Sequence, residues 1–553
     1  MAAELQVITE FSKKFLRTLY DPDIPSGPIK TFLSTTPLYD DKRKCWVTIP
    51  PVAEREEDMY DPFLEVIKSI LANLVIPNEG AKSTREAFDT HKTSFPHHDG
   101  AKTRPDIAIV ATGPSFEDPL PADLDLTNSG GETTRLVGYS NVASVFDLKR
   151  NKDNSRVEQI KQLAVYAKQI FLSQPNRRFV RALIITEDKV RLLHYDRSGA
   201  YITDMINFHD EAETFVRLVV ALSSHIEEHV GLDSSIQWTV DDNNRKVAGT
   251  ICVRDDRSPD ATPDTFYLDM KEPPLVHETI RGTGTTCWVA RDSDGNRIHV
   301  KDSWIASERM PEHELLEQAE FDEVEGVVTE IEAYEDGTAQ TKQYRPKLFK
   351  STNFFNRNFC RVALKVPGPP LSKFTSQLEA ITALRDGIKG HRNLLTAGIL
   401  HRDICMNSII IVKNDKGQMG GKLWDLTLAI HCDEKAELSP DSRTGSRLYL
   451  SSAVLRNSKE EKQLAPVVHD YLDDLEAFNY VLADLLHSYK GVGIAMPPQA
   501  ANDLIPIWQN SAGQAASQSK LHFMEEGPVD WIISPFWSNP SIELCRNLGM
   551  YLH

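Results

Sequence analysis

Hydrophobic residues in the first half of the chain follow helical spacing in two segments and strand-like runs in four others. Helical spacing predicts helices over DPFLEVIKSILANLV (61–75), which starts with Asp and Pro, and over RVEQIKQLAVYAKQIFLSQ (156–174). The tight pair Glu187 and Asp188 separates the last two strand-like runs. The four runs are DIAIVA (106–111), ASVFDLK (143–149), FVRALIIT (179–186) and KVRLLHYD (189–196). This order of helix, strands, helix and strands predicts an α/β or α+β unit.

The second half opens with a strand pattern and then becomes mainly helical. In ETIRGTGTTCWVARDSDGNRIHVKDSW (278–304) the turn DSDGN separates two strand-like runs, which predicts a hairpin. A helix is expected from Pro311 and a strand at RVALKV (361–366), and the pattern is mostly helical from Ser376 onward. The irregular stretch 335–358 is predicted to be an exposed loop or insertion.

These patterns divide the chain into two domains. The segment DDNNRKVAGTICVRDDRSPDATPDT is polar, charged and contains Pro, with one short apolar run. We therefore predict an N-terminal α/β domain over 1–235, a linker with one short strand over 236–270, and an α+β domain over 271–553. The last of these is expected to have two lobes, 271–366 and 367–553.

Composition narrows the function classes. The chain has 553 residues, of which 41% are hydrophobic and 26% charged, a balance that supports a globular core. A formal net charge of -18 argues against broad binding to nucleic acid or anionic lipid. We find neither an apolar run of membrane-spanning length nor a secretory signal, and the seven cysteines contain no CxxC pair. We expect a reduced cytoplasmic or nuclear protein without a membrane partner.

Several residues match the needs of phosphoryl transfer, which requires held phosphates, a held magnesium ion and a carboxylate beside the attacking hydroxyl. In RGTGTTCWV, Gly282 and Gly284 would let backbone amides approach phosphate, with Val289 beyond them. An ordinary hairpin turn explains the same glycines. Lys301, on the partner strand, is the candidate phosphate-binding lysine, and Glu312 on the following helix is its candidate partner.

The stretch HRDI provides the candidate catalytic base. Asp403 would orient the substrate hydroxyl and accept its proton, with Arg402 beside it. Asp425, in GKLWDLTLAI, is the candidate magnesium ligand, with Asn407 or Ser408 as a second ligand. The alternative for each residue is an ordinary side chain without a catalytic role, but their order and spacing favour the functional interpretation.

Together these motifs resemble the fungal-type protein kinases, a divergent branch of the eukaryotic protein kinases. The resemblance rests on RGTG, VKDSW, LKVPGPPLSKF, GHRNLLTAGILHRDI, LWDLTLA, SRTGSRLYLSS and DDLEAFNYVL. It implies a two-lobed kinase domain, ATP, Mg²⁺ and transfer to Ser or Thr hydroxyls of a protein substrate. It also implies that Asp474 braces the HRD backbone and that the activation segment, with Ser439, Ser442 and Thr444, is a candidate for phosphorylation.

Three positions depart from the pattern of this family. Cys287 replaces a glycine, Ala453 replaces a glutamate, and Ser408 stands where the second metal-binding residue is an asparagine. These departures support an alternative hypothesis, a pseudokinase that acts as a nucleotide-binding scaffold. The retention of Lys301 and Asp403 supports the active enzyme.

A second constellation lies in the first half. Asp106, Asp147 and Lys149 spell PD…DxK, which resembles restriction-like nucleases in which two carboxylates hold magnesium. Glu65, and one of Gln159 and Gln162, could complete such a site. The alternative for this half is a structural or substrate-docking domain in which the Asp and Lys form a surface pair.

Overall fold

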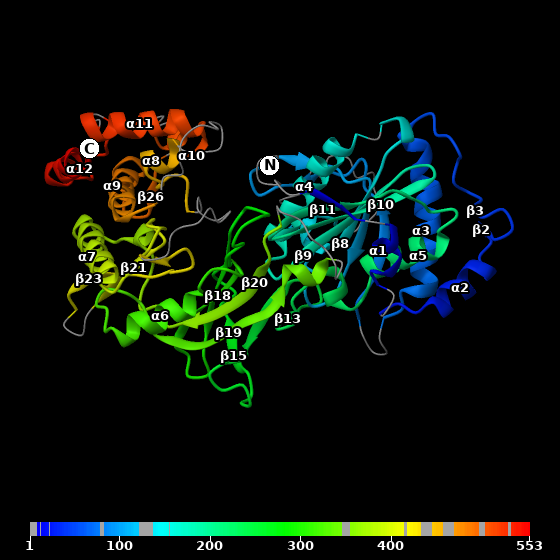
Figure 1. Cartoon of the computed structure of the whole chain (residues 1–553), viewed down its shortest axis with the longest axis horizontal. Helices are drawn as coiled ribbons and strands as arrows, with labels where there is room; N and C mark the ends of the chain where they lie inside the picture. Colours follow the sequence, from blue (N-terminus) through cyan, green and yellow to red (C-terminus); the bar gives the residue numbers. More distant parts are fainter. Residues whose placement is uncertain are drawn as a thin grey trace.

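The protein is described by a computed structural model that combines helices with two large sheets, an α+β fold. Figure 1 shows the second sheet, in green, between the first sheet with its helices and the C-terminal helices. No helix in the described part is long and apolar enough to cross a membrane. The described residues are 8–11, 13–20, 23–77, 82–120, 136–153, 155–345, 354–413, 417–432, 445–456, 469–496, 504–528 and 532–553.

The first sheet is a mixed sheet in the order β1-β11-β10-β9-β8-β7-β4, and β12 pairs with β10. β8 runs parallel to β9 and β1 runs parallel to β11, whereas the other neighbours are antiparallel. Every strand predicted from the sequence in this half is present. The strands are β1 (Ile8–Phe11), β4 (Arg85–Asp89), β7 (Ile107–Ala111), β8 (Val142–Leu148), β9 (Phe179–Ile185), β10 (Lys189–Asp196), β11 (Gly199–Thr203) and β12 (Ile206–Asn207).

Helices cover both faces of this sheet because its strands carry apolar residues on both faces. Ile107 and Ile109 of β7 pack against the same core as α3 and α5, whereas Ala108 and Val110 face the core built on α4. We call the part of the chain up to Leu232 the first region. Its helices are α1 (Lys13–Thr18), α2 (Ser26–Thr35), α3 (Tyr60–Leu74), α4 (Arg156–Ser173) and α5 (Ala212–Leu222), with small hairpins β2 (Tyr39–Asp40), β3 (Cys45–Trp46), β5 (Phe95–Pro96) and β6 (Lys102–Thr103).

The second sheet is antiparallel, in the order β13-β14-β15-β17-β18-β20-β19, with β16 on β17. The sequence predicted a linker with one short strand at 236–270, but three strands form there, and they extend this sheet. Part of the expected loop 335–358 is also a strand. The strands are β13 (Ile236–Val240), β14 (Lys246–Val253), β15 (Asp264–Leu268), β16 (Leu275–Val276), β17 (Thr286–Arg291), β18 (Arg297–Ala306), β19 (Ile331–Gln340) and β20 (Arg357–Leu364).

Edge pairing explains these two differences. The strands of 236–268 alternate between buried and more exposed residues, for example buried Ile251 and Val253, but charged and proline-containing turns interrupt them. Such short strands become stable only when a neighbouring sheet supplies hydrogen-bond partners, which local sequence does not show. The predicted β17–β18 hairpin and the helix α6 (Glu312–Phe321) after Pro311 are present.

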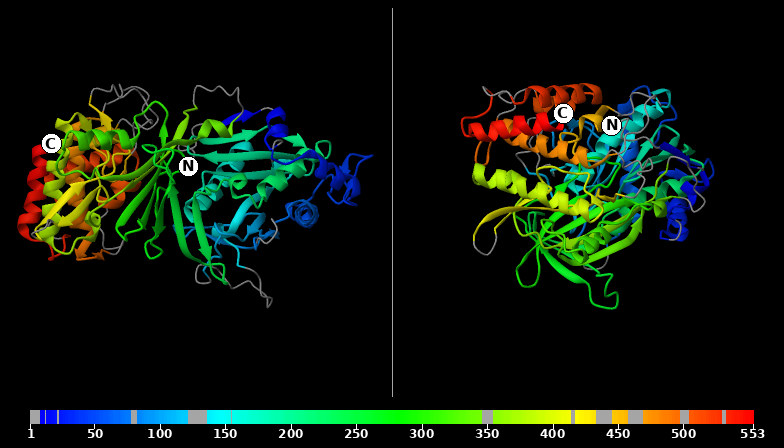
Figure 2. Two further views of the ribbon diagram at one scale, coloured as in Figure 1. Left: turned by 90° about the horizontal axis from the view of Figure 1, so that it is seen from below. Right: turned by 60° about the vertical axis from the view of Figure 1, so that its left-hand side comes forward.

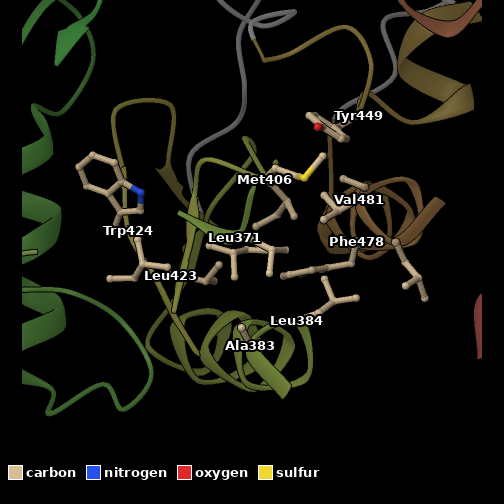
Figure 3. Packing of buried hydrophobic residues seen from close by; sticks show 14 of the residues in the cluster. Leu371, Ala383, Leu384, Met406, Leu423, Trp424, Tyr449, Phe478 and Val481 are labelled. Atoms are coloured by element: carbon tan, nitrogen blue, oxygen red, sulfur yellow. The ribbon is translucent and has the colours of Figure 1, made fainter. Parts of the chain in front are cut away.

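The C-terminal helical region packs around α9. Its apolar core joins Ala383 and Leu384 of α7 to Phe478 and Val481 of α9, and Trp424 lies at the margin of this group in Figure 3. The helices are α7 (Gln377–Thr396), α8 (Ser452–Arg456), α9 (Tyr471–Ser488), α10 (Leu504–Asn510), α11 (Gly513–Glu526) and α12 (Asn539–Leu552). The short strands are β21 (Ile399–Leu400), β22 (Ile409–Lys413), β23 (Met419–Leu423), β24 (Ile430–His431), β25 (Tyr489–Gly491) and β26 (Ile494–Ala495).

Buried ion pairs join the first region to the second sheet. Arg345 donates to both carboxylate oxygens of the fully buried Asp196, with Nη2 2.9 Å from Oδ1. Asp233, just after the first region, lies 3.0 Å from Arg361 of β20 and 3.0 Å from Arg178 of the first region. Bidentate pairs of this kind fix orientation, so the two parts meet in one defined geometry. In the left view of Figure 2 the green sheet lies next to the first region.

Candidate functional site

Lys301, Glu312 and Asp425 meet between the second sheet and the C-terminal region. Nζ of Lys301, on β18, lies 2.5 Å from Oε1 of Glu312, the first residue of α6. The same ammonium lies 2.7 Å from Oδ1 of Asp425, which follows β23. The Lys301 and Glu312 side chains are 1% exposed and that of Asp425 is 28% exposed. The structure thus brings Asp425 to Lys301 and Glu312, which lie more than 100 positions earlier in the sequence.

The three ionisable groups of this cluster differ in how their surroundings shift the pKa. Burial alone would raise the pKa of Asp425, but Lys301 outweighs it and holds this pKa at about 2. Burial raises the pKa of Glu312, because this carboxyl is the more deeply enclosed of the two and Lys301 only partly offsets the effect. Burial disfavours the charge of Lys301, but the two carboxylates outweigh it and raise its pKa. Lys301 therefore stays protonated at neutral pH.

The backbone around Asp425 is fixed by Glu312. Asp425 has a positive φ of 71°, a conformation that is uncommon for a residue with a side chain. The amide of Leu426 donates to Oε1 of Glu312 at 2.7 Å, and the hydroxyl of Thr427 donates to Oε2 at 3.2 Å. Lys301 and the Thr427 amide use Oδ1 of Asp425. Among the described residues, both hydrogen bonds to this carboxylate go to Oδ1 and none to Oδ2.

The catalytic-loop candidate is braced by Asp474. Its Oδ2 accepts from the amide of Arg402 at 3.1 Å and from Nε2 of His391 at 3.0 Å, and its Oδ1 contacts Nε2 of His469 at 2.9 Å. Arg402 has a positive φ of 67°, so these bonds hold the backbone at an uncommon conformation. The bracing contact expected for Asp474 is present.

Asp403 is partly exposed beside the same loop. Its amide donates to Nδ1 of His401 at 3.2 Å, and its Oδ1 accepts from the amide of Ser446 at 3.3 Å. Burial and then the neighbouring Asp425 carboxylate raise the pKa of Asp403 to about 7. A carboxyl with a pKa near the operating pH is suited to accept a proton from a hydroxyl.

Ser408 and Asn407, the two candidates for a second magnesium ligand, make their contacts with Cys405 and Trp424. The Ser408 hydroxyl is buried, accepts from the Cys405 amide at 2.9 Å and donates to the Cys405 carbonyl at 3.1 Å. Asn407 is exposed, and its backbone carbonyl accepts from the Trp424 indole at 2.5 Å. Ser408 thus closes the turn of the loop, and neither side chain has a contact with Asp425 in the described structure.

Trp424 and His299 are neighbours of this site that sequence reasoning missed. Their rings meet edge to face with centroids 5.3 Å apart, and Nζ of Lys301 lies 5.5 Å from the indole centroid. Sγ of Cys287 lies 3.6 Å from Nδ1 of His299. Burial lowers the pKa of His299 to about 4, so its ring is neutral. Trp424 is 7% exposed, and its indole lies between His299 of β18 and the loop of Asn407, next to Lys301.

The glycine turn lies between β16 and β17. Gly282 and Gly284 have positive φ values of 129° and 51°. Within the described residues the amides of Thr283 and Gly284 donate no hydrogen bond, and the three residues of the turn are buried. Val289 pairs with His299 across β17 and β18 and lines a cleft of about 1020 Å³ between the first region and the second sheet, away from Lys301. Ser439, Ser442 and Thr444 lie outside the described residues.

The PD…DxK residues also come together, at the ends of β7 and β8. Nζ of Lys149 lies 2.9 Å from Asp147 and 3.5 Å from both Asp106 and Glu56. Oδ1 of the buried Asp147 has no hydrogen-bond partner in the described part of the protein. Glu65 is exposed on α3, so the glutamate of this cluster is Glu56, which the sequence analysis did not identify.

The position of Glu56 in the chain explains why the sequence analysis named Glu65 instead. Glu56 belongs to a single turn just before α3, where the chain bends toward the sheet, whereas Glu65 points outward from the helix. Gln159 is buried on α4, and Gln162 donates to the Tyr166 hydroxyl at 2.8 Å. Among the described residues no group of three or more His, Cys, Asp and Glu side chains is arranged to hold a metal ion.

A family comparison decides the relationship that these geometries suggest. The sequence model described as fungal protein kinase matches residues 125–486, from before β8 to within α9. The chain belongs to the fungal protein kinase family. A search of curated proteins found no match.

The match includes part of the first region as well as the kinase-like motifs. For this member of the fungal protein kinases, Asp147 and Lys149 lie inside the matched residues, whereas Asp106 and Glu56 lie outside them. The strands and helices from β8 to α9 are therefore part of the family's shared sequence, and the first sheet is completed by strands that precede it.

Proposed function

We propose that the protein is an ATP- and magnesium-dependent kinase that transfers the γ-phosphoryl group to serine or threonine hydroxyls of a protein. The observation that carries this proposal is the buried contact of Lys301 with Glu312 and Asp425, with the partly exposed Asp403 in the braced loop beside it. The family relationship supports the reaction class. The proposed site lies between two lobes, the second sheet with α6 and the C-terminal helical region.

Each residue has a defined task in this proposal. Glu312 orients Lys301, and Lys301 binds phosphate oxygens. Asp403 orients the substrate hydroxyl and accepts its proton. Asp425 holds magnesium through Oδ2, and the ion supplies charge neutralisation between phosphates when it is bound. One or two carboxylates with phosphate and water are an ordinary ligand set for Mg²⁺, so the donor set here fits one ion.

Binding of nucleotide can be tested separately from transfer. Thermal unfolding should shift upward with ATP and Mg²⁺ together, and this shift should be lost in Lys301→Met. Lys365→Met is a matched control, because Lys365 also contacts two glutamates but lies at the surface. Equal shifts in both variants, or none in the unchanged protein, would contradict nucleotide binding at Lys301.

A second candidate is a pseudokinase scaffold. The contact of Trp424 with His299 and the commitment of Ser408 to Cys405 favour it, because the first fills space beside Lys301 and the second removes a metal ligand. A scaffold binds nucleotide weakly or not at all and transfers no phosphoryl group. Phosphoryl transfer that depends on Asp403 separates the two candidates.

A third candidate is a metal-dependent, nuclease-like activity in the first region. It is favoured by the order α3, β4, β7, β8, α4, β9 and by the unpartnered Oδ1 of Asp147. Lys149 occupies the position between the carboxylates, so a divalent cation would have to displace its ammonium. Cleavage of a DNA or RNA duplex with Mg²⁺ or Mn²⁺ that Asp147→Asn abolishes would support this candidate, and the absence of cleavage would eliminate it.

A further inference from the structure

The glycine turn of the candidate site is covered by the first region. Ile280, two residues before Gly282, is 2% exposed and belongs to the same hydrophobic cluster as Phe171 of α4 and Tyr195 of β10. Lys168 of α4 lies 3.1 Å from Glu278 at the start of the same segment. A segment of the kinase-like sheet thus contributes to the core of the preceding region.

Arg197, in the turn between β10 and β11, makes the closest contacts. Its backbone carbonyl accepts from the amide of Gly282 at 3.0 Å. Its Nη1 donates to the carbonyl of Thr279 at 2.8 Å, and its guanidinium carbon lies 4.3 Å from the ring centroid of Phe171. Arg197 is 2% exposed. One residue therefore holds the turn through both its backbone and its side chain.

The contact with Arg197 gives a reason for glycine at position 284. A Cβ atom there would lie 2.2 Å from Nε and 2.4 Å from Cδ of Arg197, too close for any side chain. At Gly282 a Cβ would meet only Oγ1 of Thr279, at 3.5 Å. Gly284 is thus required by the packing of Arg197, and Gly282 is not.

The opposite side of the turn is tied to the strand that carries Lys301. The amide of Trp304 donates to the carbonyl of Thr283 at 2.7 Å, and Trp304 lies three residues beyond Lys301 on β18. The neighbouring Ser198 donates to Thr341 or accepts from it at 2.7 Å, next to the buried pair of Asp196 and Arg345. The turn is therefore held on one side by the contacts between the first region and the second sheet, and on the other side by β18, the strand that carries Lys301.

We propose that Arg197 is a positioning residue for the nucleotide: it holds the turn at Gly282–Gly284 and, through the Thr283 carbonyl, the strand β18 that carries Lys301, without touching phosphate itself. This inference rests on the kinase function proposed above. A turn with two glycines at positive φ loses much conformational freedom when it orders. Arg197 orders it before the nucleotide arrives, which lowers the cost of binding.

The test compares Arg197→Ala and the milder Arg197→Lys with the unchanged full-length protein. Arg85→Ala is a matched control: Arg85 is also a buried arginine of the first region that donates to backbone carbonyls and covers an aromatic ring, Phe116 at 4.8 Å. Arg85 lies on β4, the strand at the opposite edge of the sheet from β11. Both alanine variants lose comparable packing, but only one of them loses contact with the turn.

Two readouts are needed. Hydrogen exchange should be faster at the amides of 279–285 in both Arg197 variants and unchanged there in Arg85→Ala. The dissociation constant of MgATP, from calorimetry, should rise about three- to tenfold in Arg197→Ala, less in Arg197→Lys and not in Arg85→Ala. Unchanged exchange, or unchanged or tighter MgATP binding in Arg197→Ala, would overturn the inference.

The kinase proposal itself fails in a different way. If the unchanged protein does not bind MgATP, the proposed function is wrong. Hydrogen exchange at the amides of 279–285 then reports only on the contact between the first region and the second sheet. A further variant strengthens the case: Gly284→Ala should weaken MgATP binding more in the unchanged background than in Arg197→Ala, because truncation of Arg197 removes the side chain that the new methyl group meets. Equal losses in both backgrounds would contradict the packing argument.

Discussion

Nζ of Lys301 and Oε1 of Glu312 are 2.5 Å apart in an ion pair whose two side chains are each only 1% exposed. The pair also determines the backbone of the next segment, because Glu312 accepts from the amide of Leu426. Loss of either charge therefore affects both the proposed phosphate-binding lysine and the placement of Asp425.

Lys301→Met should destabilise the protein strongly. It leaves Glu312 without its buried counterion, and removal of one partner of a buried pair typically costs about 3–5 kcal/mol. Denaturant unfolding of the variant and of Lys301→Met/Glu312→Leu measures this cost, and the double variant should recover much of the lost stability. If the double variant were less stable than the single one, the hydrogen bonds of Glu312 with Leu426 and Thr427 would outweigh the cost of its unpaired charge.

Trp424→Ala should bind nucleotide more tightly than the unchanged protein. The indole lies beside Lys301 and His299, so its removal opens room for a nucleotide next to Lys301. The variant should also lose about 3–5 kcal/mol of stability, as for other buried tryptophans. Trp508→Ala is the control, since Trp508 is fully buried among α10 and α11 and should lose stability without any gain in affinity. Unchanged affinity in Trp424→Ala would show that the indole does not compete with nucleotide.

Ser408→Ala should lower stability but leave the magnesium requirement unchanged. The hydroxyl makes two hydrogen bonds with Cys405, and the loss of such bonds costs about 1–2 kcal/mol. Thermal unfolding and the magnesium dependence of MgATP binding measure the two effects. A higher magnesium requirement in Ser408→Ala, and not in Asn407→Ala, would identify Ser408 as a metal ligand.

Asp147→Asn should become more stable relative to the unchanged protein as the pH rises. Burial, and then the neighbouring Asp106 carboxylate, raise the pKa of Asp147 from 3.8 to about 8. The stabilising contribution of the protonated carboxyl is complete below about pH 4 and is lost as the pH rises through 8. Asparagine stays neutral, so the stability difference should grow across this range.

Denaturant unfolding at pH 5 and at pH 8.5, without divalent cations, measures this trend. The attraction of Lys149 for the ionised carboxylate is already part of the pKa of Asp147, so the change of the stability difference with pH carries the test. A stability difference that stays constant between the two pH values would show that Asp147 is ionised throughout.

The sequence predicted the elements with strong periodicity and the residues with motif spacing. The hairpin of β17 and β18, the helix α6 and the strands β7 to β10 follow from local patterns. Lys301, Glu312 and Asp425 were also named from spacing, although their contact spans more than 100 residues. Periodicity and the order of motifs are properties of the sequence itself, so they can be read without knowledge of contacts between distant segments.

What the sequence did not predict depends on contacts between distant segments. The strands at 236–268 form because the second sheet offers an edge, and Glu56 joins Lys149 because a single turn bends toward β8. The meeting of Trp424 with His299, and of Arg197 with Gly284, joins residues more than 80 positions apart. No local pattern encodes these contacts.

Transfer of labelled phosphate from ATP to a protein substrate, measured with the unchanged protein and with Asp403→Asn, tests the central claim most directly. Asp403→Asn keeps the size of the side chain but cannot accept the proton, so the account predicts magnesium-dependent transfer that falls by about 10²–10⁴-fold in the variant. Asp470→Asn, which alters an exposed helix cap of α9, should transfer normally. An unchanged protein that binds MgATP but transfers nothing, or equal transfer by Asp403→Asn, would contradict it.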